Sequence, residues 1–201
     1  MRYILEVLSN TIIYGFITLY SLQNSNSIEV SAEVVKTHTA AWIELQMTAS
    51  ALVGGILSII HPELFLAGIE SLKTLNDVPD AIHKGEELAA VLRIWSSPFT
   101  AITIISNRDT PYHRDNGSAH SWFDILVAVG EYENGRIEFP GLGMRLKYDP
   151  GTVVAFTGRV LRHGATCPGD RACIVYHMKQ NVVRELGVTE PSWVNASIFT
   201  S

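Results

Sequence analysis

The part of the chain that begins at Phe99 is a run of short apolar strands, and this pattern constrains the fold more than any other feature. Glycine, proline, asparagine and aspartate, the usual turn formers, separate the apolar segments. Short strands at regular spacing with such turns are typical of an antiparallel sandwich or barrel. The predicted strands are FTAITIIS (99–106), FDILVAVG (123–130), GRIEF (135–139), MRLKY (144–148), GTVVAFTG (151–158), VLRHG (160–164) and ACIVYHMK (172–179).

The first half of the chain carries helical patterns instead. HPELFLAGIESLKTL (61–75) is predicted as a helix, because Pro62 suits a first turn and Glu63 favours the positive end of the helix dipole. DAIHKGEELAAVLRIW (80–95) is predicted as a second helix, with Asp80 as its N-cap. Helices followed by strands indicate the α+β class, with the helices packed on one face of a curled sheet.

The remaining N-terminal segments are predicted to contribute to the core of the same domain. IEVSAEVV (28–35) alternates apolar and polar residues, as a half-buried strand does. ILEVLSNTIIYGFITLYSL (4–22) is apolar, but Glu6 and Asn10 interrupt it and no typical cleavage site follows. We therefore expect core elements of a soluble domain here, and neither a signal peptide nor a membrane helix.

Composition limits the classes of protein that fit. The chain has 201 residues, 47% hydrophobic and 17% charged, which is enough for one folded domain with a substantial core. The formal net charge of −5 argues against tight nonspecific binding of nucleic acid. Cys167 and Cys173 form no C-x-x-C pair, so we expect two free thiols in a reducing compartment.

One H-x-D pair stands directly after an apolar strand. His113 and Asp115 are two positions apart, and such a pair alone is equally typical of an ordinary solvated turn. His163 follows 48 residues later, a gap that fits return of the chain to the same mouth of a barrel. Two imidazoles and one carboxylate on one face are the ligand set that suits Fe(II) in oxygen-activating sites. Zinc is a poorer match, because catalytic zinc sites rarely leave room for a chelating cosubstrate.

A basic residue follows the second histidine. Arg171 opens a strand eight residues beyond His163, and its side chain needs an anion if it points into a barrel. A dicarboxylate that chelates iron at one end would meet this guanidinium at the other. Arg108 is the next candidate for this anion site.

The motifs together resemble a known family. The segments TPYHRD (110–115), SWFDILVAVG (121–130), PGLGMRLKYDPGTVVAFTGRVLRHG (140–164) and RACIVYHM (171–178) are similar to the Fe(II)/2-oxoglutarate dioxygenases of the TET/JBP group, and most similar to its fungal branch. The resemblance spans about residues 60–195. It implies a double-stranded β-helix, or jelly-roll, core within one domain over 1–201. In that reading 1–95 support a catalytic region at 96–185.

The resemblance also implies roles for the motif residues. His113, Asp115 and His163 would bind the iron, and Arg171 would bind the distal carboxylate of 2-oxoglutarate. Cys173 stands where the animal enzymes have a serine, and would still line the cosubstrate pocket. The cofactors implied are Fe(II) and 2-oxoglutarate, with O2 as cosubstrate.

The substrate implied by the resemblance is a methylated nucleobase flipped out of nucleic acid, above all 5-methylcytosine in DNA. Oxidation would yield 5-hydroxymethylcytosine and further oxidised forms, while N6-methyladenine would lose its methyl group. The base-reading asparagine of the animal enzymes is replaced by Ser118, with Asn116 nearby. His177, on the strand that begins at Arg171, is a further candidate for the substrate pocket.

Asp124 is the one charged residue in an otherwise apolar strand. A buried carboxylate is costly unless it is paired or meets a ligand. One explanation is an ion pair with Arg136 or Arg145. The other is a hydrogen bond to the exocyclic amino group of a flipped cytosine or adenine.

Two other functions stay open at this point. A dioxygenase of the same fold could hydroxylate a protein side chain or a small molecule, and a barrel could serve as a non-catalytic binding module. The complete H-x-D, His and Arg set argues against the module. We further expect a monomer that acts inside the cell, in the nucleus or cytoplasm, without a membrane partner.

Overall fold

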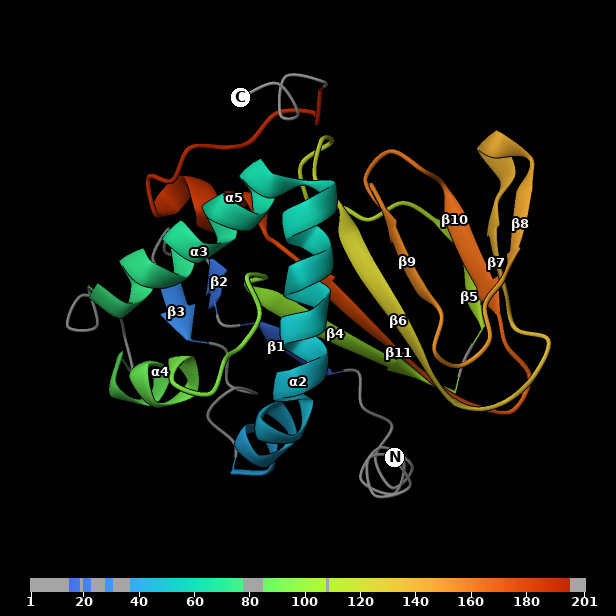
Figure 1. Ribbon diagram of the computed structural model, residues 1–201, viewed down its shortest axis with the longest axis horizontal. Helices are drawn as coiled ribbons and strands as arrows, with labels where there is room; N and C mark the ends of the chain where they lie inside the picture. Colours follow the sequence, from blue (N-terminus) through green and yellow to red (C-terminus); the bar gives the residue numbers. More distant parts are fainter. Residues whose placement is uncertain are drawn as a thin grey trace. The chain divides into compact units, whose positions relative to one another are not determined.

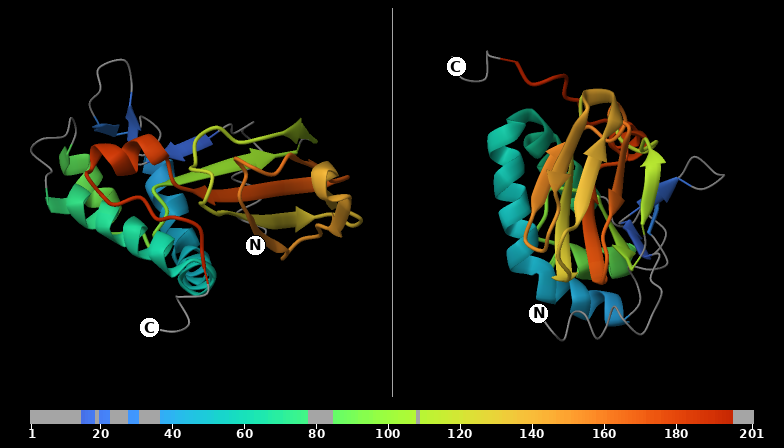
Figure 2. Two further views of the ribbon diagram at one scale, coloured as in Figure 1. Left: turned by 90° about the horizontal axis from the view of Figure 1, so that it is seen from above. Right: turned by 90° about the vertical axis from the view of Figure 1, so that its right-hand side faces the viewer.

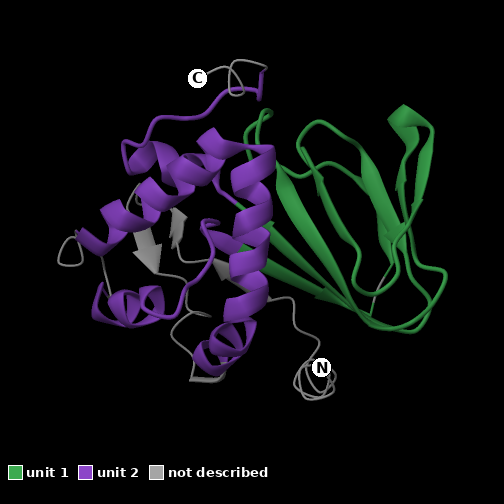
Figure 3. Ribbon diagram, in the orientation of Figure 1, with its two compact units in different colours: residues 1–16, 102–177 green, residues 17–101, 178–201 purple. Residues whose placement is uncertain are grey.

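The computed structural model divides the chain into two compact units (Figure 3). One unit comprises residues 1–16 and 102–177, and the other comprises 17–101 and 178–201. The structure describes residues 15–18, 20–22, 28–30, 37–77, 85–107 and 109–195, with side chains from residue 39 onward.

The first unit contains two antiparallel sheets (Figure 1). The larger sheet has the order β1-β4-β11-β6-β9, formed by β1 (Gly15–Thr18), β4 (Ala101–Ser106), β11 (Asp170–His177), β6 (Asp124–Glu131) and β9 (Val153–Phe156). The smaller sheet has the order β5-β10-β7-β8, formed by β5 (Thr110–His113), β10 (His163–Thr166), β7 (Arg136–Phe139) and β8 (Met144–Lys147).

The chain passes back and forth between these two sheets from β4 to β11. Consecutive strands therefore lie mostly in opposite sheets, as in a jelly roll (Figure 2). Side chains from both sheets meet in one apolar cluster, where the rings of Phe139 on β7 and Phe156 on β9 pack edge to face at 4.9 Å. The cluster consists of Leu126, Ala128, Tyr132, Ile137, Phe139, Tyr148, Phe156, Ala165 and Cys173.

Alternation of side chains sets the two faces of each strand. On β7, Ile137 and Phe139 are buried while Arg136 is exposed, because successive side chains point to opposite faces of a sheet. The turn to β8 runs through the short helix η2 (Pro140–Leu142). Gly143 closes it with φ of 63°, a left-handed conformation that glycine adopts without strain.

The second unit is mainly helical. It contains β2 (Tyr20–Leu22), β3 (Ile28–Val30), α2 (Thr37–Ile60), α3 (Pro62–Asp77), α4 (Gly85–Leu92) and α5 (Gln180–Glu185). His61, fully buried between α2 and α3, accepts a hydrogen bond at Nδ1 from the backbone N–H of Leu64 at 3.3 Å, and so caps the start of α3. Gly68 on α3 lies so close to the backbone of Pro98 that a Cβ there would collide with it.

The predicted α+β class with a double-stranded β-helix core is confirmed. All seven strands predicted from Phe99 onward have a counterpart, although β10 begins at His163 and not at Val160, since residues 158–160 form a turn. Of the strand predicted over 28–35, the described part is β3 (Ile28–Val30). The strand β5, which carries the H-x-D histidine, was not predicted. The packing of helices on one face of the sheet stays a prediction, as does the division into a support region over 1–95 and a catalytic region over 96–185. Asp80, the predicted N-cap, lies outside the described residues.

Helix α2 is the largest departure from the sequence prediction. Trp42, Val53 and Leu57 are buried along one side, but Leu52 and Ile59 on the other side are 67% and 75% exposed. Apolar residues on both sides hide the helical period, so the pattern did not identify this helix.

Within the described residues, the segment Thr39–Ile60 of α2 is also long and apolar enough to cross a membrane, by length and composition alone. A core helix of a soluble protein passes the same test. The expectation of no membrane partner therefore stays a prediction.

Candidate active site

Two histidines lie opposite each other on neighbouring strands of the smaller sheet. β5 ends at His113 and β10 begins at His163, and the antiparallel register pairs these two residues directly. Asp115 follows β5, and its backbone N–H donates to the carbonyl oxygen of Gly158 at 3.0 Å. Strand register and this single hydrogen bond bring His163 together with His113 and Asp115, although His163 lies 48 residues after Asp115 in the sequence. We call His113, Asp115 and His163 the triad.

Backbone carbonyls set the tautomer of both imidazoles. Nδ1 of His113 lies 2.9 Å from the carbonyl oxygen of Pro111, and Nδ1 of His163 lies 2.9 Å from that of Leu161. A carbonyl can only accept, so each Nδ1 carries a hydrogen, and the lone pair of a neutral ring then stands at Nε2. A hydrogen bond at the far ring nitrogen is the usual support of a metal-binding histidine.

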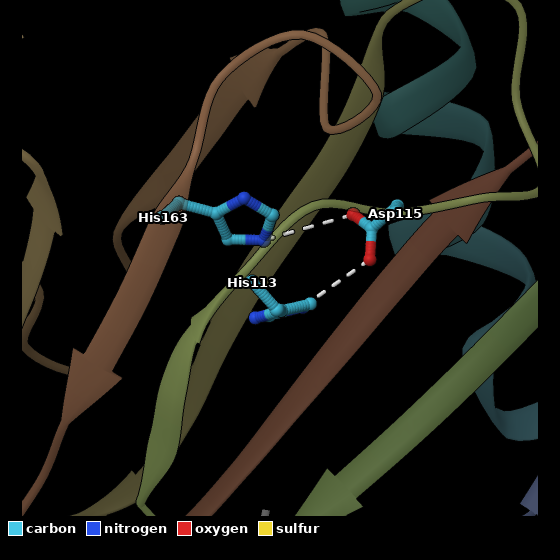
Figure 4. A group of neighbouring side chains, drawn as sticks. All are labelled: His113, Asp115 and His163. Atoms are coloured by element: carbon cyan, nitrogen blue, oxygen red, sulfur yellow. Dashed lines mark ion pairs between the residues drawn. The ribbon is translucent and has the colours of Figure 1, made fainter. Parts of the chain in front are cut away.

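The free nitrogens point at one carboxylate (Figure 4). Nε2 of His113 is 3.2 Å from Oδ1 of Asp115, and Nε2 of His163 is 3.6 Å from Oδ2 of the same residue. One ligand atom from each residue lies within 4.8 Å of the others, close enough to bind one ion. Two neutral imidazoles and one carboxylate are a donor set that fits Fe(II) and leaves further positions open.

Burial differs between the members of the triad. His163 is buried, and the ring of Phe156 packs edge-on against it at 4.6 Å. Burial lowers the pKa of His163 and so favours the neutral ring that a metal needs. The side chains of His113 and Asp115 are 37% and 35% exposed, so access to the site is from their side.

Arginines connect the two loops beside the triad. Nε of Arg114 donates to the carbonyl oxygen of Val160 at 2.9 Å. The guanidinium of Arg159 donates to the backbone and side-chain oxygens of Asn116 at 3.1 and 3.3 Å. These contacts hold the segment after β5 against the segment after β9.

Arg171 is buried within the first unit, and its predicted binding of the cosubstrate stays a prediction. It is 3% exposed, and its guanidinium carbon is 5.6 Å from the centre of the Tyr148 ring. Its backbone N–H donates to the side-chain oxygen of Asn107 at 2.8 Å. The buried thiol of Cys173 lies beside it, 3.1 Å from the hydroxyl of Tyr148. Both cysteines are free, as expected from the sequence.

Asp124 has neither of the ion-pair partners considered from the sequence. Arg145 pairs with Glu138 at 2.5 Å, while Asp124 accepts a hydrogen bond from the hydroxyl of Ser118 at 2.6 Å. Burial raises the pKa of Asp124 to about 7 and nearby Asp115 adds to the rise, while the hydrogen bond from Ser118 and the nearby backbone of Gly158 oppose it.

Two of the other predicted site residues, Asn116 and His177, make polar contacts with neighbouring residues. Asn116 is exposed and bonded to Arg159. His177 is half-buried at the end of β11, with Nε2 3.0 Å from the hydroxyl of Thr103. Arg108 lies outside the described residues. Their predicted contacts with substrate and cosubstrate stay predictions, as does the binding of iron by the triad.

Two residues at this site were missed by the sequence reasoning. Tyr148 contacts both Arg171 and Cys173. The carbonyl oxygen of Gly158 accepts the hydrogen bond from the backbone N–H of Asp115. Both stand inside the quoted segment YDPGTVVAFTG (148–158), so the motif contained them. Only the folded structure shows what they contact.

The jelly-roll fold with a histidine–aspartate–histidine set at one mouth defines the class of Fe(II)/2-oxoglutarate-dependent dioxygenases. Comparison with protein families supports this class: residues 21–180 match Tet_JBP, described as the oxygenase domain of the 2OGFeDO superfamily. The chain belongs to this family, as predicted. Its placement in the fungal branch stays a prediction.

A solved structure shares this fold. NgTET1, solved in complex with 5mC DNA, matches with a TM-score of 0.64 and 16% sequence identity, over 99% of this chain and 72% of that one. A cupin 2 conserved barrel domain protein from Salinispora arenicola CNS-205 matches 43% of this chain and 67% of its own, with 16% identity. Its TM-score of 0.27 is too low to support an argument. No curated protein matches the sequence.

Proposed function

We propose that this dioxygenase oxidises the methyl group of a modified nucleobase, above all 5-methylcytosine in DNA. The observation that carries the proposal is the triad, with both histidine tautomers fixed so that two Nε2 atoms and one carboxylate converge. Family membership supports the cofactors Fe(II) and 2-oxoglutarate. NgTET1, which shares the fold, was solved with 5mC DNA, and this supports nucleic acid as the partner.

In this proposal the triad holds the metal, which with 2-oxoglutarate and O2 supplies the oxidation of a C–H bond. His163 contributes the buried side of the site, where the ring of Phe156 excludes water. His113 and Asp115 contribute the partly exposed side, from which cosubstrate and substrate enter. The backbone carbonyls of Pro111 and Leu161 keep both rings oriented before the metal binds.

Arg171 would bind the distal carboxylate of 2-oxoglutarate. The guanidinium matches a carboxylate with two parallel hydrogen bonds, and its burial excludes competing water. Tyr148 would hold the guanidinium by its ring face, and Cys173 would line the same pocket.

The base would be read at the exposed rim of the site. Asn116, which Arg159 holds in place, and His177, which bonds Thr103, carry polar groups suited to the edge of a flipped base. Oxidation of 5-methylcytosine would give 5-hydroxymethylcytosine and further forms, and demethylation of N6-methyladenine is a close variant of the same chemistry.

Mass spectrometry of methylated substrates tests this proposal. Duplex DNA, single-stranded DNA, RNA and free nucleosides, each with 5-methylcytosine or N6-methyladenine, would be incubated with enzyme, Fe(II), ascorbate and 2-oxoglutarate. We expect oxidised 5-methylcytosine in DNA, together with succinate. Asp115→Ala is the matched control, since it removes the one carboxylate of the triad and should yield neither product.

An anaerobic titration separates the other outcomes. The purified protein with Fe(II) and 2-oxoglutarate should develop the visible charge-transfer band of the chelated metal. A band without turnover on any methylated nucleic acid would point to a protein or small-molecule substrate. Absence of the band would refute the metal site itself and favour a binding module.

A further inference from the structure

Asp124 is buried beside the triad but makes no hydrogen bond to any of its three members. It starts β6 opposite Phe156, is 1% exposed, and its Oδ1 accepts the Ser118 hydroxyl at 2.6 Å. Its Oδ2 makes no hydrogen bond of normal geometry with the described residues. A carboxylate in this state is costly, so the surroundings have to compensate for it.

Gly158 shows where that second oxygen points. A Cβ built on Gly158 would lie 2.6 Å from Oδ2 of Asp124 and 3.1 Å from Cγ of Asp115. Two carboxyl groups thus converge on one bare α-carbon, and the carbonyl of the same glycine accepts the N–H of Asp115. A Cβ at this position would also lie 2.2 Å from Oδ2 of Asp115, so any side chain there would collide with the ligand carboxylate.

We propose that Asp124, with Ser118 and Gly158, positions Asp115 as a ligand of the metal site. The carboxyl groups of Asp124 and Asp115 flank the same α-carbon of Gly158, so the place of Asp124 limits where Asp115 can lie. Ser118 lies only three residues after Asp115, so its bond to Asp124 also anchors the loop that carries the ligand. Asp124 is therefore a positioning residue. The inference rests on the proposed metal site and adds a residue to it.

This role differs from the base-reading role predicted from the sequence. A base-reading carboxylate needs a free face toward the substrate, whereas Asp124 is 1% exposed and already engaged by Ser118. The two roles predict different Fe(II) affinities for a variant at Asp124. Loss of a positioning residue should weaken Fe(II) binding, whereas loss of a residue that only reads the base should leave it unchanged.

The test is an anaerobic Fe(II) titration, with and without 2-oxoglutarate, followed by the charge-transfer band. Asp124→Asn should weaken Fe(II) binding about 10- to 100-fold and shift or diminish the band, the usual result of losing support behind a ligand. Ser118→Ala, which keeps Asp124 but removes its partner, should weaken binding in the same direction by a smaller factor. Glu131→Gln, an exposed carboxylate at the other end of β6, is the matched control and should behave as wild type.

Melting curves of the metal-free variants separate positioning from folding. If Asp124→Asn does not fold, Ser118→Ala with a normal melting temperature carries the test. Fe(II) affinity within about twofold of wild type in both variants, with altered base preference for Asp124→Asn, would overturn the positioning role in favour of base reading. Failure of the wild-type protein to bind Fe(II) would instead refute the proposed function itself.

Discussion

Arg171→Lys tests the cosubstrate site most directly. The lysine keeps the positive charge but loses the planar fork that can bind both oxygens of a carboxylate. It also loses the packing of the guanidinium over the Tyr148 ring, whose centre lies 5.6 Å from the guanidinium carbon. The side chain is 3% exposed, so water cannot replace the missing contacts.

The magnitude follows from these contacts. One charge-assisted hydrogen bond contributes about 1.5–3 kcal/mol, and the contact with the ring about 0.5–1 kcal/mol. A lysine recovers part of this by its own hydrogen bond. We therefore expect a loss of about 1.4 kcal/mol or more, which is at least a tenfold rise in the 2-oxoglutarate concentration needed for half-saturation.

The assay measures succinate formation against 2-oxoglutarate concentration at saturating Fe(II) and DNA. Binding of the nucleic acid, measured separately, should change little. Arg145→Lys on exposed β8 is the control, and its half-saturation should equal that of wild type. An unchanged half-saturation in Arg171→Lys would refute the reasoning and move the anion site elsewhere, with Arg108 the next candidate.

Further predictions concern catalysis and stability. Alanine at any one triad position should abolish turnover in the mass-spectrometric assay yet leave circular dichroism unchanged, and near-normal activity of one such variant would contradict the assignment. Tyr132→Phe should cost about 1–3 kcal/mol in urea unfolding, because it removes the 2.8 Å hydrogen bond to the buried carbonyl of Tyr148. Leu64→Ala, at a position with no exposed surface, should cost about 2–5 kcal/mol by the same measurement. In the metal-free protein, the pKa of Asp124 is raised to about 7, so the folded state holds the proton more tightly than the unfolded state does. The melting temperature should therefore fall as pH rises from about 4 to 7. Asp124→Asn should make this fall smaller.

The strands and the chemistry of the site were predictable because both signals are local. The alternation of Ile137 and Phe139 with polar neighbours reports which face of a strand is buried, whatever the rest of the chain does. The order of His113, Asp115, His163 and Arg171 likewise states which donors are available. Their residue types alone favour iron and an anionic cosubstrate.

Helix α2 could not be predicted in the same way. The hydrophobic period identifies a helix only when one side is polar, and α2 carries Leu52 and Ile59 on its exposed side. Its buried side, with Trp42 and Leu57, is defined by what packs against it within the helical unit. That information is not in the local pattern.

The geometry of the site was decided by tertiary structure alone. Strand register places His163 opposite His113, and two backbone carbonyls choose the ring tautomers. The partner of Asp124 is a serine on a loop and not an arginine, because the strand start and the loop after Asp115 meet at Gly158. The sequence determined which groups are present and in what order. Distances of a few ångströms between segments 48 residues apart depend on the pairing of whole sheets, which no local pattern encodes.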